Sequence, residues 1–265
     1  MINKKLHKQG KILILLLSIS VLFSCSIIKL ENKQKQQVPD KVQQAENLLA
    51  RGVASYRQYN YTQAGAFFNK ALYAYRSIDN PQGIILSLSN LAKTSLALGN
   101  VPLAVKYLTK AKNIIATAEK PFNNKIINHL IIVESSIKIE KKEYNSAIKI
   151  LQPLLETSHS PDSELRIAAL QNRVRIAIAQ HDPHTAQWLQ QFSQSISNSQ
   201  QNNYSARLLR FKAALSHNSD EQNTYYHQAL KIYRDNANQV GIAATLEEWS
   251  QQQYQLKQYH AATDK

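Results

Sequence analysis

The chain has 265 residues and a formal charge of +14, with 32 Lys and Arg residues against 18 Asp and Glu residues. Its single cysteine excludes a disulfide within the chain, and six glycines with little strand-type alternation favour a helical protein. An excess of cations is typical of proteins that meet nucleic acid, an anionic membrane surface or an acidic partner.

The N-terminus has the pattern of a secretory signal. Residues 1–11 contain four lysines and no acidic residue, and the run ILILLLSISVLF at 12–23 has two serines as its only polar members. A basic start, a short apolar stretch and a small residue before the cleavage point are typical of such signals. The run is shorter than the roughly 20 apolar residues of a membrane span. Extended through Ile28 it would reach a marginal span, so an uncleaved anchor helix stays open as the alternative.

Leu22, Phe23, Ser24 and Cys25 resemble the lipobox of bacterial lipoproteins, although Phe23 departs from the family pattern. The resemblance implies cleavage between Ser24 and Cys25, and lipidation of Cys25 with acyl chains such as palmitate. Two or more such chains anchor a protein stably on a membrane, whereas a single chain holds it weakly. In diderm bacteria, Ser26 after the cysteine implies the inner leaflet of the outer membrane, with the rest of the chain facing the periplasm.

We therefore expect three segments: a signal peptide at 1–24, a lipidated cysteine with a flexible linker at 25–39, and a helical domain at 40–265. Loss of residues 1–24 would remove four lysines and leave a formal charge of +10. The lysines beside the anchor suit either contact with lipid headgroups or cell wall, or a solvated linker, and both interpretations stay open. These residues are Lys29, Lys33, Lys35 and Lys41.

An internal repeat runs through the rest of the chain, which points to an array of similar units. FFNKALYAYR at 67–76 returns as YYHQALKIYR at 225–234, 158 residues later, a gap that holds four units of about 40 residues. Proline is tolerated in the first turn of a helix. Pro81, Pro121 and Pro161 follow one another at intervals of 40 residues, each before an apolar-periodic segment. Both observations predict helical units of about 40 residues.

Each unit has apolar residues at intervals of three and four, which predicts two amphipathic helices. In the first unit we expect helices at about 41–58 and 61–77, joined by the turn YNYT. Small residues at matched positions let two such helices approach closely, and a bulky residue fills the gap between them. In the first two units these positions are Gly52, Ala64, Phe68 and Ala71, then Ala92, Ala104, Leu108 and Ala111.

This spacing resembles the tetratricopeptide repeat, in a longer form of about 40 residues that covers 40–265. The resemblance implies an all-α, right-handed superhelix of five to six helix–turn–helix repeats. In the fifth unit Arg210 stands where a small residue belongs, so either the register is displaced or the helices splay. The sixth ends seven residues into an expected second helix, at YHAATDK. The middle units match less closely, with Ser135, Ala147, Leu151 and Leu154 in the third, and Val174, Ala186, Gln190 and Ser193 in the fourth.

In such a superhelix the first helix of each unit lines a concave groove that binds peptides. Two units share an Asn followed three residues later by a cation. In tetratricopeptide domains an Asn at that place commonly holds a peptide backbone, and a nearby cation can bind a carboxylate. Each residue could equally be a solvated polar residue on a helix face. The candidate partner-binding residues are Tyr56, Arg57, Asn90, Lys93, Asn172, Arg175 and Arg207, with Leu49 and Val53 on the same inward face.

Residues 181–184, HDPH, combine two histidines and an aspartate, which suits either a metal ion or a turn that starts a helix, and we expect the turn. The sequence contains no phosphate-binding loop, nucleophile elbow or HExxH motif. We therefore expect no catalytic residues, no metal and no cofactor.

The sequence thus predicts a lipid-anchored periplasmic scaffold, rather than an enzyme, that binds a protein or peptide partner in the cell envelope. It predicts neither a nucleic-acid partner nor a small-molecule substrate. Pilus or secretion assembly and the regulation of cell-wall hydrolases are both compatible with this role. Two alternatives stay open. One is direct binding of cell wall or lipopolysaccharide; the other is nucleic-acid binding on the cytoplasmic side of an uncleaved anchor, which would weaken steeply with salt.

Overall fold

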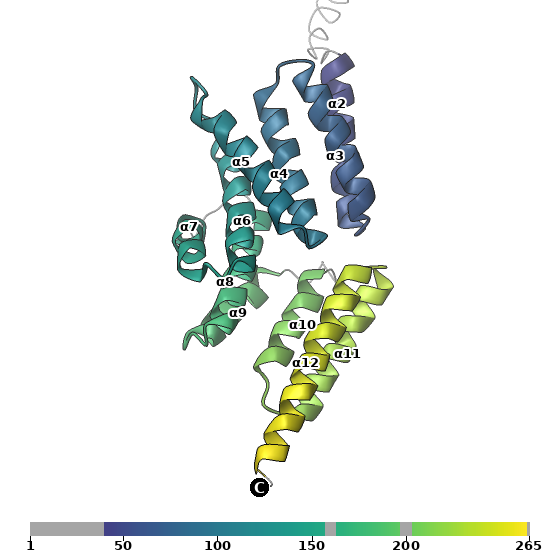
Figure 1. Ribbon diagram of the computed structural model, residues 1–265, viewed down its shortest axis with the longest axis vertical. Helices are drawn as coiled ribbons and strands as arrows, with labels where there is room; N and C mark the ends of the chain where they lie inside the picture. The colour runs from purple at the N-terminus through teal and green to yellow at the C-terminus, as the bar shows by residue number, and fades with distance from the viewer. Residues whose placement is uncertain (1–39, 157–162, 197–202, 264–265) are drawn as a thin grey trace, which may run out of the picture. The chain divides into compact units, whose positions relative to one another are not determined.

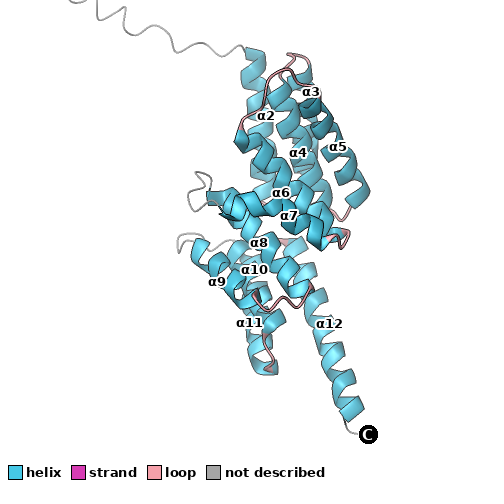
Figure 2. Ribbon diagram, turned by 90° about the vertical axis from the view of Figure 1, so that its left-hand side faces the viewer, coloured by secondary structure: helices cyan, strands magenta, loops and turns pink. Residues whose placement is uncertain are grey.

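The computed structural model describes residues 40–156, 163–196 and 203–263, and these residues form helices and no strand (Figure 1). Figure 2 shows the same helices joined by short loops. The all-α expectation is confirmed for this part of the chain, whereas the predicted signal peptide, Cys25 and linker lie outside it. The helices are α2 (Asp40–Arg57), α3 (Tyr61–Arg76), α4 (Pro81–Ala97), α5 (Val101–Ala116), α6 (Asn124–Glu140), α7 (Tyr144–Glu156), α8 (Ser163–Ala179), α9 (Thr185–Ser195), α10 (Asn203–Leu215), α11 (Ser219–Asp235) and α12 (Gln239–Thr263).

The helices begin at a recurring asparagine. The Asn80 side-chain oxygen, for example, accepts a hydrogen bond from the Gly83 backbone N–H at 2.9 Å, which satisfies a donor that the first turn of α4 leaves free. Pro81 follows as the first residue of α4, as expected. The same capping starts α3, α5, α6, α11 and α12, at Asn60, Asn100, Asn123, Asn218 and Asn238. A polar side chain of one residue type therefore sets most of the helix starts.

Helices that are neighbours in the chain pack against each other. These contacts join α3 with α4, α4 with α5, α6 with α7, α8 with α9, α10 with α11, and α11 with α12. The first helices of successive units, α4, α6, α8, α10 and α12, also pack on one another in that order. The side chains of Leu49, Val53 and Tyr56 on α2 pack against the apolar cluster of α3 to α6. Among the described residues, no helix is both long and apolar enough to cross a membrane.

The matched small and bulky positions are where paired helices meet. A β-carbon on Gly52 would lie 2.5 Å from the Phe68 ring, so α2 and α3 can approach this closely only because position 52 has no side chain. Phe68 fills the gap, and it is completely buried. The corresponding positions of the next two units are buried as well: Ala92, Ala104, Leu108, Ala111, Ser135, Ala147, Leu151 and Leu154.

The expected register of the fourth unit is wrong in its second helix. Ala186 and Gln190 are exposed, whereas the buried face of α9 carries Thr185 and Phe192, one residue earlier than expected. Phe192 is fully buried in the cluster that joins α8, α9 and α10. A large aromatic side chain gains far more from burial than a glutamine, so the position of Phe192 decides which face of the short helix turns inward.

The fifth unit keeps the expected register, so Arg210 at the small-residue position causes no shift of register. Gln222, Tyr226 and Ala229 are buried at the expected spacing after Arg210. Arg210 is itself only 8% exposed, and its guanidinium forms an ion pair with Glu248 of α12.

The expected break in the sixth unit is absent. Helix α12 runs as one helix from Gln239 to Thr263, through the position at which a second helix was expected to begin.

Candidate functional site

Side chains from three units converge around the C-terminal end of α2. The Lys93 ammonium of α4 lies 4.7 Å from the centre of the Tyr56 ring, a cation–π contact. The Tyr61 ring, at the start of α3, lies 5.0 Å from that of Tyr56. Tyr204 and Arg207 of α10 are close enough to act electrostatically on the Tyr56 hydroxyl. We call these five residues the aromatic–cationic cluster.

Burial in this cluster changes the acidity of its members. Desolvation raises the pKa of Tyr56, and Arg207 partly opposes the increase. Desolvation also lowers the pKa of Lys93, although nearby Glu164 favours its charged form. Lys93 is nevertheless exposed to solvent. The Lys93 ammonium therefore lies against the Tyr56 ring and still meets solvent, where it can contact an incoming anion.

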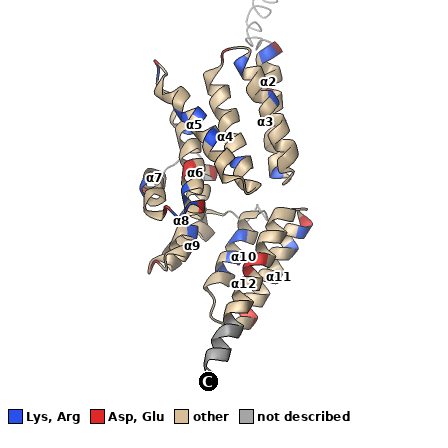
Figure 3. Cartoon of the chain, viewed as in Figure 1, with Lys and Arg blue, Asp and Glu red and all other residues tan. Residues whose placement is uncertain are grey.

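The cluster carries more positive than negative charge. Arg57 pairs with Glu164 of α8 at 3.5 Å, and both side chains are mostly exposed. Among the described residues, no ion pair includes Lys93 or Arg207. Some cations of other helices are paired, as for Lys112 with Glu134 of α6 at 3.0 Å. Figure 3 shows red segments on α6 and blue segments on the helices around it.

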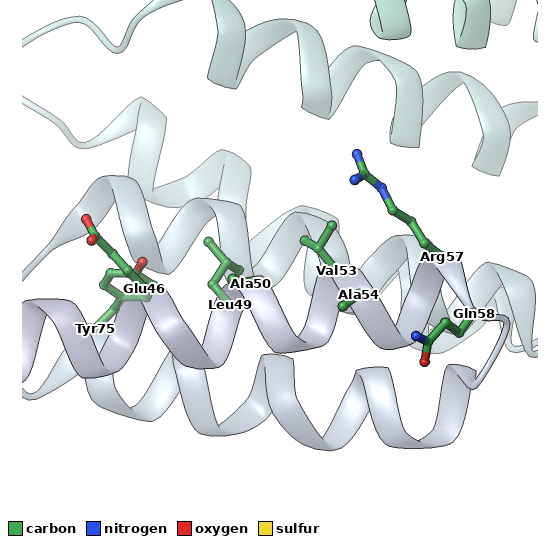
Figure 4. A pocket seen from close by; sticks show the side chains of 8 residues that line it. All are labelled: Glu46, Leu49, Ala50, Val53, Ala54, Arg57, Gln58 and Tyr75. Carbon is green, nitrogen blue, oxygen red and sulfur yellow. The ribbon is translucent and has the colours of Figure 1, made fainter. Parts of the chain in front are cut away.

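A groove of about 590 Å³ opens along α2 beside this cluster. Leu49, Val53 and Arg57 lie on the same side of the helix (Figure 4), as the sequence predicted for the inward face. Ala50 and Ala54 also line the groove, which the sequence did not predict; both are exposed, and their small side chains leave the groove open. The remaining lining residues are Glu46, Gln58 and Tyr75. The groove therefore has an apolar floor with an acidic residue near one end and a basic residue near the other.

The second predicted pair, Asn172 and Arg175, has a different role from the one expected. Asn172 is 2% exposed, and its amide donates hydrogen bonds to the hydroxyls of Ser135 and Ser136 at 2.8 and 2.9 Å. Arg175 forms an ion pair with Glu140 at 2.8 Å. Both residues therefore join α8 to α6, and neither belongs to the aromatic–cationic cluster. Burial is the physical reason: α6 covers the face of α8 on which Asn172 lies.

Asn90, the other predicted asparagine, bonds within its own helix. Its amide donates to the Leu86 carbonyl at 2.9 Å, and the residue is only partly buried. Of the predicted groove residues, the structure thus brings together Tyr56, Arg57, Lys93 and Arg207. Glu164 was not predicted. It lies 107 residues from its partner Arg57, and no sequence spacing marks such a contact.

The HDPH segment forms a turn. Asp182 bonds the Arg173 guanidinium at 2.6 Å and accepts a hydrogen bond from the His184 backbone at 2.9 Å. The His184 backbone bond, and then Arg173, lower the pKa of Asp182. Arg173 also lies 4.6 Å above the Trp188 ring. Within the described ranges, no three His, Cys, Asp or Glu residues gather in a way that could hold a metal ion.

No protein-family model matches this sequence, and no curated protein matches it either. The function is therefore inferred from the chain's own residues: the paired helices, the groove along α2 and the aromatic–cationic cluster at its basic end.

Proposed function

We propose that this protein is a non-catalytic scaffold that binds a protein or peptide partner on the inner face formed by α2, α4 and α10. The observation that carries the proposal is the aromatic–cationic cluster beside the open groove on α2. The clustered side chains suit contact with a ligand rather than proton transfer, because aromatic rings and cations supply area, hydrogen bonds and charge.

The finer architecture is part of this proposal. We take the helix pairs to wind as the right-handed superhelix of a tetratricopeptide protein. Two features support it: the first helices of successive units pack on one another, and the small and bulky positions of the first three units are buried at the repeat spacing. In that arrangement the first helices would line the concave face.

Binding would combine an apolar and an electrostatic contribution. A partner side chain that covers Leu49 and Val53 in the groove gains about 25 cal/mol for each Å² of apolar surface removed from water. A partner carboxylate near Lys93 would meet an exposed ammonium that forms no ion pair within the described residues. Specificity would come from the rings of Tyr56 and Tyr61, whose positions are fixed by packing against each other.

We further propose that Cys25 carries acyl chains and that the helical domain acts in the periplasm at the outer membrane. The support is the lipobox-like segment at 22–25 and the apolar run before it. Labelled palmitate should enter the protein, and Cys25→Ser should abolish both the label and the cleavage before position 25. Equal labelling of the two proteins would remove the basis for this location.

Photo-crosslinking in the native cell tests the binding role. A photoreactive residue at Ala54, which is exposed in the groove, should capture one discrete protein or peptide partner. The matched control is Ala116, an exposed alanine of α5 outside the groove and cluster. Lys93→Gln should weaken the adduct at Ala54 several-fold. Identical adducts from both positions, or an adduct at Ala54 that Lys93→Gln does not change, would contradict binding at this face.

A further inference from the structure

The first helix pair is held against α8 and α10 by contacts that bridge distant parts of the sequence. Arg57, at the end of α2, pairs with Glu164 of α8 at 3.5 Å. The Asn203 amide of α10 donates a hydrogen bond to the Tyr59 hydroxyl, 144 residues away in the chain. We propose that Arg57, Tyr59, Glu164 and Asn203 form a clasp that holds the first helix pair against α8 and α10 and that can open.

Tyr59 has a backbone conformation that a bulky residue rarely adopts. Its φ is 63°, in the left-handed region, and the corresponding turn of the second unit has Gly99 with φ 75°. Glycine populates this region without strain, whereas a tyrosine there carries a conformational cost of about 1 kcal/mol or more. The bond from Asn203 gives the tyrosine at this position a role that glycine could not fill.

Asn203 is positioned to make this contact. Its side-chain oxygen accepts a hydrogen bond from the Asn238 amide at 3.0 Å. Asn238 is itself 4% exposed, and its own oxygen caps α12 by accepting from Gly241 N–H at 2.8 Å. Two successive hydrogen bonds thus fix Asn203 by its oxygen and leave its nitrogen free to donate to Tyr59. This half of the clasp is therefore held by contacts that do not involve the first helix pair.

The clasp is weak enough to open. The Arg57 and Glu164 side chains are 68% and 61% exposed, and ion pairs of this kind are screened by salt and contribute little to stability. Each apolar cluster of the described residues joins helices that are neighbours in the array, and none joins α2 to α10. The aromatic–cationic cluster also bridges α2 and α10, so opening of the clasp separates Tyr56 from Tyr204 and Arg207. Because few contacts cross this joint, open and closed conformers can coexist.

The clasp and the groove share Arg57, which also lines the open face of α2. A partner carboxylate that binds the Arg57 Nη2 donor would compete with Glu164 for it. This consequence rests on the proposed function, whereas the existence of the clasp does not. Partner binding and clasp opening would then be coupled, because each changes the population of the state that the other requires.

Distances between two spin labels test the clasp without any partner. The full chain carrying Cys25→Ser has no other cysteine, so Asn69→Cys in α3 and Lys231→Cys in α11, both exposed, can be labelled cleanly. We expect mostly short distances in this protein. Tyr59→Phe with Glu164→Gln removes both contacts with minimal change of shape, and it should raise the long-distance fraction about fivefold.

Tyr107→Phe with Glu134→Gln is the matched control, since it removes the same groups from a tyrosine and an ion pair of α5 and α6 outside the clasp. The control should keep the short distances, and raising the salt concentration should lengthen them only where the clasp is intact. The proposal is overturned if the clasp variant and the control give the same distribution, or if salt lengthens both equally. Neither result bears on photo-crosslinking at Ala54, so the two proposals can fail separately.

Discussion

Gly52→Ala is expected to destabilise the first helix pair, although alanine is normally the better helix former. The added β-carbon would lie 2.5 Å from two atoms of the Phe68 ring, and Phe68 is fully buried, so the ring has little space in which to move. Overpacking a core costs about 1 to 3 kcal/mol, whereas alanine in place of glycine within a helix gains up to about 1 kcal/mol. The expected net loss is about 1 to 2 kcal/mol.

Gly65→Ala, in the same helix pair, is the matched control. A β-carbon there would lie 3.7 Å from a Thr94 methyl group of α4, which is an ordinary van der Waals distance. We expect it to stabilise the protein by about 0.5 to 1 kcal/mol. The two glycine changes should therefore shift the free energy of unfolding in opposite directions, which helix propensity alone does not predict.

The second unit suggests a rescue, because it buries Ala92 and Leu108 at the positions of Gly52 and Phe68. Gly52→Ala with Phe68→Leu should be more stable than the sum of the single changes by about 1 kcal/mol. Urea unfolding followed by far-ultraviolet circular dichroism measures all four variants, with the slope checked for constancy. The reasoning fails if Gly52→Ala is as stable as Gly65→Ala, or if the double variant is additive.

Three further predictions test individual contacts. Asn172→Ala should lower the free energy of unfolding by about 1 to 3 kcal/mol, because it removes a buried amide that bonds two hydroxyls; Lys93→Ala should lower it far less. Glu248→Ala leaves the Arg210 guanidinium buried without its partner and should cost about 1 to 3 kcal/mol in urea unfolding. The pKa of Asp182 is lowered in the folded protein, so its carboxylate stabilises the fold above the ordinary pKa and loses this effect as pH falls through the folded value. The stability difference between wild type and Asp182→Asn should therefore be constant near neutral pH and vanish in strong acid.

The sequence correctly predicted features that depend on residues within one unit, such as helix bounds and buried positions. The first two helices were expected at about 41–58 and 61–77, and they lie at Asp40–Arg57 and Tyr61–Arg76. Phe68 and Leu108 were expected to fill the gaps between paired helices, and both are buried. Apolar periodicity and the small-to-bulky spacing act within a single unit, so one unit of sequence contains the information that places them.

Apolar periodicity within one unit does not predict which polar residues of a helix face water. The motif of an asparagine followed by a cation occurs at Asn90 and at Asn172, yet only Asn172 is almost fully buried. The difference lies in the neighbouring unit, where α6 presents two adjacent serine hydroxyls to the Asn172 amide. The exposure of Asn172 thus depends on Ser135, which lies 37 residues away in the chain. Periodicity within one unit contains no information on that contact.

The continuity of α12 could have been predicted from the local sequence, although a break was expected there. Four turns between helices place a residue with positive φ directly before the asparagine that caps the next helix: Tyr59, Asp79, Gly99 and Ala237. The segment QLKQYH at 255–260 contains neither glycine nor asparagine. Without an asparagine side chain to cap a new helix, the backbone hydrogen bonds are best satisfied by continuing the helix already formed.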